Sequence, residues 1–198
     1  MDMLLYFIVF YEKEQPMIKK FISRFTVFEL MIITLFAAMG IAVKSVITPL
    51  THILTGPLYI PGGVVAGGIY MLFLVLAVAL TGKRGAAIFC SFCQGIMVLI
   101  LGAGGSHGAL SVVSYTLTGL SVEIIMLILR HEGCCLLCCF FSGMAANLTG
   151  TMIVNVAFFE MPAIPLALSL AVAALSGGFG GALAWEFAKQ LKKLGVIK

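Results

Sequence analysis

Two long apolar segments joined by a short polar turn constrain this chain more than any other feature. They cover residues 62–80 and 86–101, and the turn at residues 82–85 reads Gly-Lys-Arg-Gly. Each segment has about 16 to 20 residues, enough for a helix rising about 1.5 Å per residue to cross a hydrocarbon core roughly 30 Å thick. The pair therefore predicts a transmembrane helical hairpin.

The rest of the chain repeats this pattern on both sides of the hairpin. Hydrophobic residues make up 62% of the sequence and charged residues 10%, whereas a soluble domain is about 45–50% apolar and about 25% charged. We therefore predict an all-α, polytopic membrane protein, a bundle of six transmembrane helices in which Pro49 closes the first. The expected spans are about residues 27–47, 62–80, 86–101, 109–129, 134–158 and 163–188.

Lysine and arginine decide the predicted orientation. With the N-terminus inside, the outer segments 48–61, 102–108 and 159–162 contain neither residue, whereas the inner segments contain most of them. The positive-inside rule then places both termini in the cytoplasm of a multi-pass protein of the cell membrane. The formal net charge of +4 follows this topology, so it does not indicate a nucleic-acid partner.

The length fits one membrane domain, residues 17–198, with no sequence to spare for an ATPase or a soluble catalytic domain. Residues 1–16 are interpreted as an extension, because their apolar run is too short to span and ends at Glu12-Lys13-Glu14. Either Met17 is the natural start or the extension is a short interfacial segment.

All six cysteines fall in the predicted cytoplasmic half, where a reducing environment disfavours structural disulfides. The cluster at residues 134–139 is interpreted as polarizable packing residues, with a metal or redox site and S-acylation as alternatives. No metal site and no cofactor are predicted.

Polar residues recur every four positions in two of the spans. Intramembrane polar groups are costly, so they usually face the bundle interior and often mark a ligand path. We expect the two stripes to line a cavity together; the alternative is hydrogen bonding between helices. The stripes are Ser111, Tyr115, Gly119 and Glu123 in the fourth span, and Gly143, Asn147, Thr151 and Asn155 in the fifth.

Seven side chains are the candidate ligand-binding residues. Amides both donate and accept hydrogen bonds, and tyrosine rings either stack on a flat heteroaromatic ligand or pack in the core. Lys44 either contacts ligand or snorkels to the outer interface, and Glu123 either contacts ligand or braces helices. The seven are Gln94, Asn147, Asn155, Tyr115, Tyr70, Lys44 and Glu123, and the expected gating residues of the outer loops are Tyr59, His107 and Glu160.

Small residues form two helix faces that allow close backbone approach. Gly177 and Gly181 in the sixth span suit packing within the monomer. Ala38 and Ala42 in the first span suit either such packing or a partner protein.

With these residues in view, residues 24–193 resemble the S components of energy-coupling factor (ECF) transporters, most closely the thiamine/hydroxymethylpyrimidine branch. Members of that branch are sometimes labelled cobalt-transport permeases. The resemblance rests on the six-span layout and on several short patterns. These are Ala38-xxx-Ala42, the glycines of residues 62–68 with Tyr70, Lys83-Arg84-Gly85-Ala86-Ala87, Gln94-Gly95, residues 102–106 and Tyr115-Thr-Leu-Thr-Gly119.

The resemblance implies capture of a vitamin, thiamine or its hydroxymethylpyrimidine precursor, beneath the loop at residues 45–63. It also implies docking through Ala38 and Ala42 on a transmembrane coupling subunit with two ATPases, followed by toppling in the bilayer. The chain has no Walker A pattern, so ATP hydrolysis is assigned to the partners and the chain itself is not an enzyme.

The sequence departs from that family in two places. The tryptophan- and histidine-rich pocket of the best-known thiamine binders is absent, since Trp185 is the sole tryptophan. The N-terminal histidine with which cobalt-binding members hold their metal is also absent, which disfavours metal transport. The alternatives are a self-sufficient secondary transporter or channel, and a membrane enzyme. The first lacks evident discontinuous helices and coupled acidic residues, and the second lacks a serine–histidine pair or paired carboxylates at membrane depth.

Overall fold

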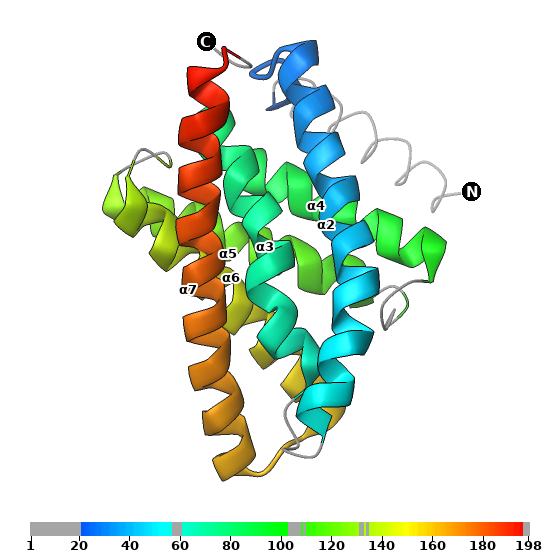
Figure 1. Cartoon of the computed structure of the whole chain (residues 1–198). Helices are drawn as coiled ribbons and strands as arrows, with labels where there is room; N and C mark the ends of the chain where they lie inside the picture. Colours follow the sequence, from blue (N-terminus) through cyan, green and yellow to red (C-terminus); the bar gives the residue numbers. More distant parts are fainter. Residues whose placement is uncertain are drawn as a thin grey trace, which may run out of the picture.

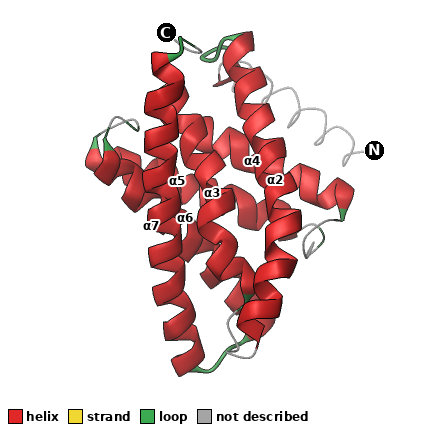
Figure 2. Cartoon of the chain, viewed as in Figure 1, coloured by secondary structure: helices red, strands yellow, loops and turns green. Residues whose placement is uncertain are grey.

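The computed structural model describes residues 21–56, 61–102, 108, 110–130, 133 and 135–195. These residues are all-helical, as Figure 2 shows, and a five-residue π-helical turn, Asn155–Phe159, continues the fifth of their long helices. The extension at residues 1–16 lies outside the described residues. The six α-helices are α2 (Val27–Thr55), α3 (Gly62–Thr81), α4 (Ala86–Leu101), α5 (Leu110–Leu129), α6 (Leu136–Val154) and α7 (Ala163–Lys193).

Helix α3 is the centre of the bundle. It packs against α2, α4, α6 and α7, and α2 and α7 run along its two sides with the start of α2 and the end of α7 at the same end of the molecule (Figure 1). Five of the helices are long and apolar enough to cross a membrane, whereas α4 has 16 residues. The prediction of an all-helical multi-pass protein is confirmed, with α4 the shortest of the six α-helices in the described residues.

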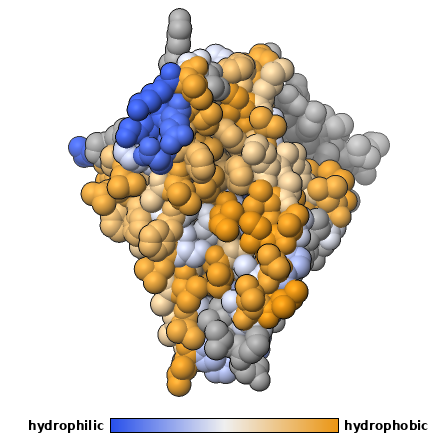
Figure 3. Space-filling view, viewed as in Figure 1, coloured by the Kyte–Doolittle hydropathy of each residue, from blue (hydrophilic) through white to orange (hydrophobic). Residues whose placement is uncertain are grey.

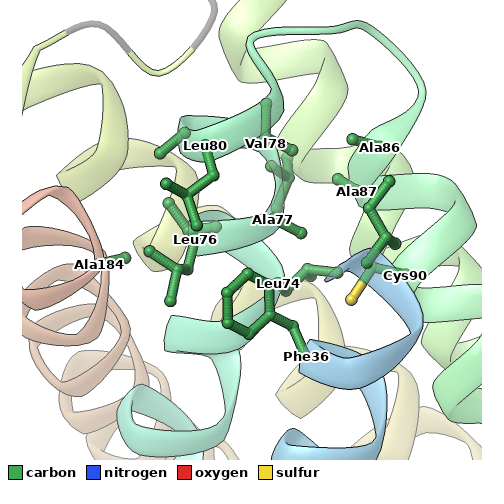
Figure 4. Packing of buried hydrophobic residues seen from close by; sticks show 14 of the residues in the cluster. Phe36, Leu74, Leu76, Ala77, Val78, Leu80, Ala86, Ala87, Cys90 and Ala184 are labelled. Carbon is green, nitrogen blue, oxygen red and sulfur yellow. The ribbon is translucent and has the colours of Figure 1, made fainter. Parts of the chain in front are cut away.

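The central position of α3 explains why its sequence is apolar on every face. A helix that is hydrophobic all round is buried on all sides, in a core or in a membrane bundle. The outer helices expose apolar residues instead, and these cover most of the face shown in Figure 3. Figure 4 shows Leu74, Leu76, Ala77, Val78 and Leu80 of α3 surrounded by Phe36 of α2, Ala86, Ala87 and Cys90 of α4, and Ala184 of α7.

The predicted end of the first span is wrong, because α2 passes through Pro49 and continues to Thr55. A proline inside a helix removes one backbone donor, but membrane helices tolerate it where neighbouring helices stabilise the segment. Here the Thr51 hydroxyl lies 2.9 Å from the carbonyl oxygen of Gly62, which joins this part of α2 to the start of α3. Much of the loop expected at residues 45–63 is therefore helix.

An ion pair fixes the start of α2 to the turn between α3 and α4. Thr26 caps α2 through a capping box with Glu29, which satisfies two backbone donors that the first turn leaves unpaired. Lys83 Nζ lies 2.6 Å from Glu29 Oε2 and 3.0 Å from the carbonyl oxygen of Arg24. The α3–α4 turn and the start of α2 therefore share one end of the bundle.

Glycines allow α3, α6 and α7 to touch through their backbones. A Cβ atom at Gly177 would meet the carbonyl oxygen of Gly143, and one at Gly181 would meet that of Cys139. The expectation that Gly177 and Gly181 pack within the monomer is confirmed.

Cys135 and Cys138 form a disulfide at the start of α6, so the expectation of no structural disulfide is wrong for this pair. Cys135 is the N-cap of α6 in extended backbone, which brings its Sγ over the first helical turn where Cys138 lies. Cys139 is buried, in agreement with the interpretation of its cluster as packing residues. Cys90 is buried as well.

Candidate ligand-binding site

A cavity of about 200 Å³ lies between α2, α3, α5 and α6. It is lined by the second half of α2, the first half of α5 and the second half of α6, so it lies away from the bundle end where α2 starts and α7 stops. Pockets for drug-sized ligands have volumes of about 300–1,000 Å³, so this one suits a smaller molecule. Six predicted residues line it: Lys44, Tyr70, Ser111, Tyr115, Asn147 and Thr151.

Lys44 and two tyrosines form the charged side of the cavity. Lys44 Nζ donates a hydrogen bond to the Tyr115 hydroxyl oxygen at 2.5 Å. The same ammonium lies 4.9 Å from the ring centroid of Tyr115 and 5.6 Å from that of Tyr70, distances at which a cation is attracted to a ring face. The Tyr70 hydroxyl donates to the carbonyl oxygen of Gly63 at 2.8 Å. The hydrogen bonds hold both rings at the cavity wall.

Asn147 of α6 is a buried polar residue in the cavity wall. Its side chain is 2% exposed, and its Nδ2 donates to the carbonyl oxygens of Val64 at 3.1 Å and Ala173 at 3.0 Å. Two carbonyl acceptors fix the orientation of the amide, since only the NH₂ end can face them. The side chain thus joins α6 to α3 and α7, and Oδ1 is the atom left to accept a hydrogen bond from a ligand.

The part of α2 beyond Lys44 supplies two further polar side chains, Thr48 and His52. The Nδ1 atom of His52 accepts from the backbone N–H of Gly62 at 3.4 Å, which leaves Nε2–H as the ring donor. The Thr48 hydroxyl is buried without a hydrogen-bond partner among the described residues. A buried polar group of this kind costs free energy until a ligand or water satisfies it.

Three predicted ligand residues do not line the cavity. Gln94 is buried between α4 and α2, where its Nε2 would meet a Cβ atom placed at Gly40. Asn155 Oδ1 accepts from the backbone N–H of Met161 at 3.0 Å. Glu123 Oε1 accepts from the backbone N–H groups of Gly85 at 2.9 Å and Ala87 at 3.0 Å.

The position of Glu123 has a simple electrostatic reason. The first N–H groups of a helix have no partner within it, and its N-terminus carries a partial positive charge. A carboxylate on α5 satisfies these groups at the start of α4. The expected ligand role of Glu123 is therefore replaced by the bracing role that was its alternative.

The structure describes one of the three predicted gating residues and both predicted docking residues. Tyr59 and His107 lie outside the described residues. Glu160 is exposed in a left-handed conformation, φ 44°, directly after the π-helical turn, and does not line the cavity. On α2, Ala38 is half-buried and Ala42 is exposed.

Sequence reasoning missed several residues that line the cavity. Thr48 and His52 follow Lys44 at intervals of four, so a helical reading past Pro49 would have placed all three on one face. Ser114 and Thr118 flank the predicted stripe of α5 and carried the same signal more weakly. The remaining missed residues include Met71, Val154 and Met161. No group of three His, Cys, Asp or Glu side chains that could hold a metal ion occurs in the part of the chain that the structure describes.

Three comparisons with known proteins bear on the fold and the family of this chain. The search of curated proteins found no match. A crystal structure described as "an S-component of ECF transporter" has the same fold, with a TM-score of 0.74, 21% sequence identity, and coverage of 87% of this chain and 88% of that one. Residues 28–149, more than half of the chain, match the family described as "ABC-type cobalt transport system, permease component". The chain therefore belongs to this family of transport permeases.

Proposed function

We propose that this chain is the substrate-capturing S component of an ECF-type importer, and that its cavity takes thiamine or its hydroxymethylpyrimidine precursor. One observation carries the proposal: polar groups of α2, α3, α5 and α6 converge on a small cavity with two tyrosine rings in its wall. The fold is also that of a solved S component, which supports the assignment of this cavity as a substrate site.

The distribution of charge supports the proposed orientation. Lys83 contacts the start of α2, and Lys192 and Lys193 form the last turn of α7. In Figure 3 the hydrophilic surface gathers at this end of α7. Basic residues favour the cytoplasmic side, so the cavity would open toward the outer face of the cytoplasmic membrane, where an importer captures substrate.

The cavity chemistry supports an organic ring as the ligand. Asn147 Oδ1 accepts, while Lys44 Nζ and His52 Nε2 donate, and a substituted pyrimidine offers both an amino donor and ring-nitrogen acceptors. The family description names cobalt, which is therefore the alternative cargo to consider. Cobalt(II) is bound by imidazole, thiolate and carboxylate ligands, and among the described lining residues His52 is the one side chain of these types.

The direct test is mass spectrometry of small molecules released from the purified, detergent-solubilised protein, with metal analysis of the same sample. We expect thiamine or hydroxymethylpyrimidine at close to one molecule per chain. Stoichiometric cobalt without an organic ligand would reject the proposed cargo. An empty protein that no vitamin stabilises in a thermal-shift screen would reject the S-component role and favour the secondary-transporter or enzyme alternatives.

The proposed contact of Ala38 and Ala42 with a coupling subunit is tested by a substitution on the outer face of α2. Ala42 is exposed there, and a small residue lets a partner helix approach closely. We expect Ala42→Leu to abolish co-purification with a coupling subunit and its ATPases while ligand binding stays at the wild-type level. The matched control is Ala171→Leu, because Ala171 is exposed on α7. Equal co-purification of the two variants would remove the assignment.

A further inference from the structure

We infer that Lys44 makes the cavity selective for an uncharged ring, so that it binds hydroxymethylpyrimidine and rejects thiamine, whose thiazolium ring carries a fixed positive charge. The inference rests on the proposed function and goes beyond it, because it separates the two ligands that the cavity shape alone leaves open. It follows from where the ammonium lies and from which charges surround it.

The ammonium group is held at the cavity wall. Lys44 Nζ is fixed by its hydrogen bond to Tyr115 and lies near the faces of both tyrosine rings. These are the rings on which a flat ligand would stack. Any ligand in contact with Tyr70 or Tyr115 is therefore close to the lysine charge.

No carboxylate of the described residues offsets that charge at the cavity. His52 is the second basic side chain in the lining, and its Nδ1 accepts a hydrogen bond from the backbone N–H of Gly62. The four described carboxylates all have other positions: Glu29 pairs with Lys83, Glu123 accepts from the start of α4, Glu186 lies 3.9 Å from Lys189, and Glu160 is exposed after α6.

Like charges in this setting have a large effect on affinity. Two unit charges a few ångströms apart repel strongly at the effective dielectric constant of about 20 that describes protein sites, and a tenfold change in affinity needs only about 1.4 kcal/mol. A cationic ligand should therefore bind about 100-fold more weakly than a neutral ligand of the same shape. The tyrosine rings do not offset this repulsion, because their cation–π attraction is already directed to Lys44.

The uncharged precursor complements the same groups. Its hydroxyl and ring nitrogens are acceptors for Lys44 Nζ and for the Nε2–H of His52, and its exocyclic amine is a donor for Asn147 Oδ1. Lys44 thus has two effects: it donates a hydrogen bond to the neutral ring, and it repels the cationic one.

The test measures affinity by isothermal titration calorimetry with three ligands: hydroxymethylpyrimidine, thiamine, and the neutral isostere of thiamine in which thiophene replaces thiazolium. For the wild type we expect thiamine to bind about 100-fold more weakly than its neutral isostere. Equal affinities for thiamine and the isostere would overturn the inference, since size and not charge would then set the preference. The wild-type comparison needs no variant, so it stands whether or not a substituted protein folds.

Two variants extend the test to the residue itself. Lys44→Met removes the charge and keeps most of the side-chain length, so it should narrow the preference for the isostere over thiamine to within about tenfold. Lys44→Arg keeps the charge and should keep the preference. An unchanged preference in Lys44→Met would overturn the assignment to Lys44, and failure of folded wild-type protein to bind any of the three ligands would overturn the proposed function instead.

Discussion

Replacing Gly180 with alanine is expected to destabilise the bundle by about 1–3 kcal/mol, the usual cost of forcing an extra carbon into a packed interior. Gly180 lies on α7 against α3, and a Cβ atom there would overlap the carbonyl oxygen of Gly68 and lie 2.8 Å from its Cα. The obstacle is backbone in the central helix, so no side-chain rotation can relieve it. The helices must separate, and the packing around them is lost.

The measurement is the thermal unfolding midpoint of the purified protein in detergent, with Gly56→Ala as the matched control. No atom of the described residues lies within 4 Å of a Cβ atom at Gly56, and its backbone is right-handed helical, φ −52°. We expect the control to unfold at the wild-type temperature and Gly180→Ala to unfold well below it. Equal midpoints would contradict a close backbone contact between Gly180 of α7 and Gly68 of α3. Gly180→Leu should prevent recovery of folded protein.

The helices could be predicted from the sequence because each is set by local hydropathy. Residues 62–80 and 86–101 contain enough apolar side chains to specify spans without knowledge of their neighbours, and α3 and α4 begin and end close to where the pattern indicates. The end of α2 could not be predicted in the same way. Pro49 indicates a helix end in water, but inside the bundle Thr51 and His52 hydrogen-bond to the start of α3 and hold the segment beyond the proline against it.

The candidate site could be predicted only in part, because helical periodicity shows which residues share a face but not what lies opposite them at each depth. Tyr115 and Glu123 belong to one stripe of α5, yet the first reaches the cavity and the second reaches the start of α4. Asn147 of α6 and Asn155, the first residue of the π-helical turn, diverge in the same way. The difference is set by backbone groups outside the stripe, in other helices and in the connection before α7, which leave no pattern in the sequence of the stripe itself.

The two asparagines form hydrogen bonds through opposite ends of the side-chain amide. Asn147 acts through its NH₂ group, which binds two carbonyl oxygens. Asn155 acts through its oxygen, which binds a backbone N–H. Both side chains are nearly fully buried, at 2% and 6% exposure. Replacing each asparagine with aspartate, which has acceptors only, therefore separates a donor role from an acceptor role.

Asn147→Asp is expected to lower the free energy of unfolding by several kcal/mol, because a buried carboxylate would face two carbonyl oxygens with no donor to offer them. It should also abolish ligand binding, since α3, α6 and α7 meet at this side chain. Asn155→Asp is the control: its carboxylate keeps the hydrogen bond from the Met161 N–H and strengthens it through charge, which offsets part of the desolvation cost. Chemical unfolding of both variants in detergent should show the larger loss at Asn147. Equal losses would contradict the donor role, because burial of charge alone would then explain both.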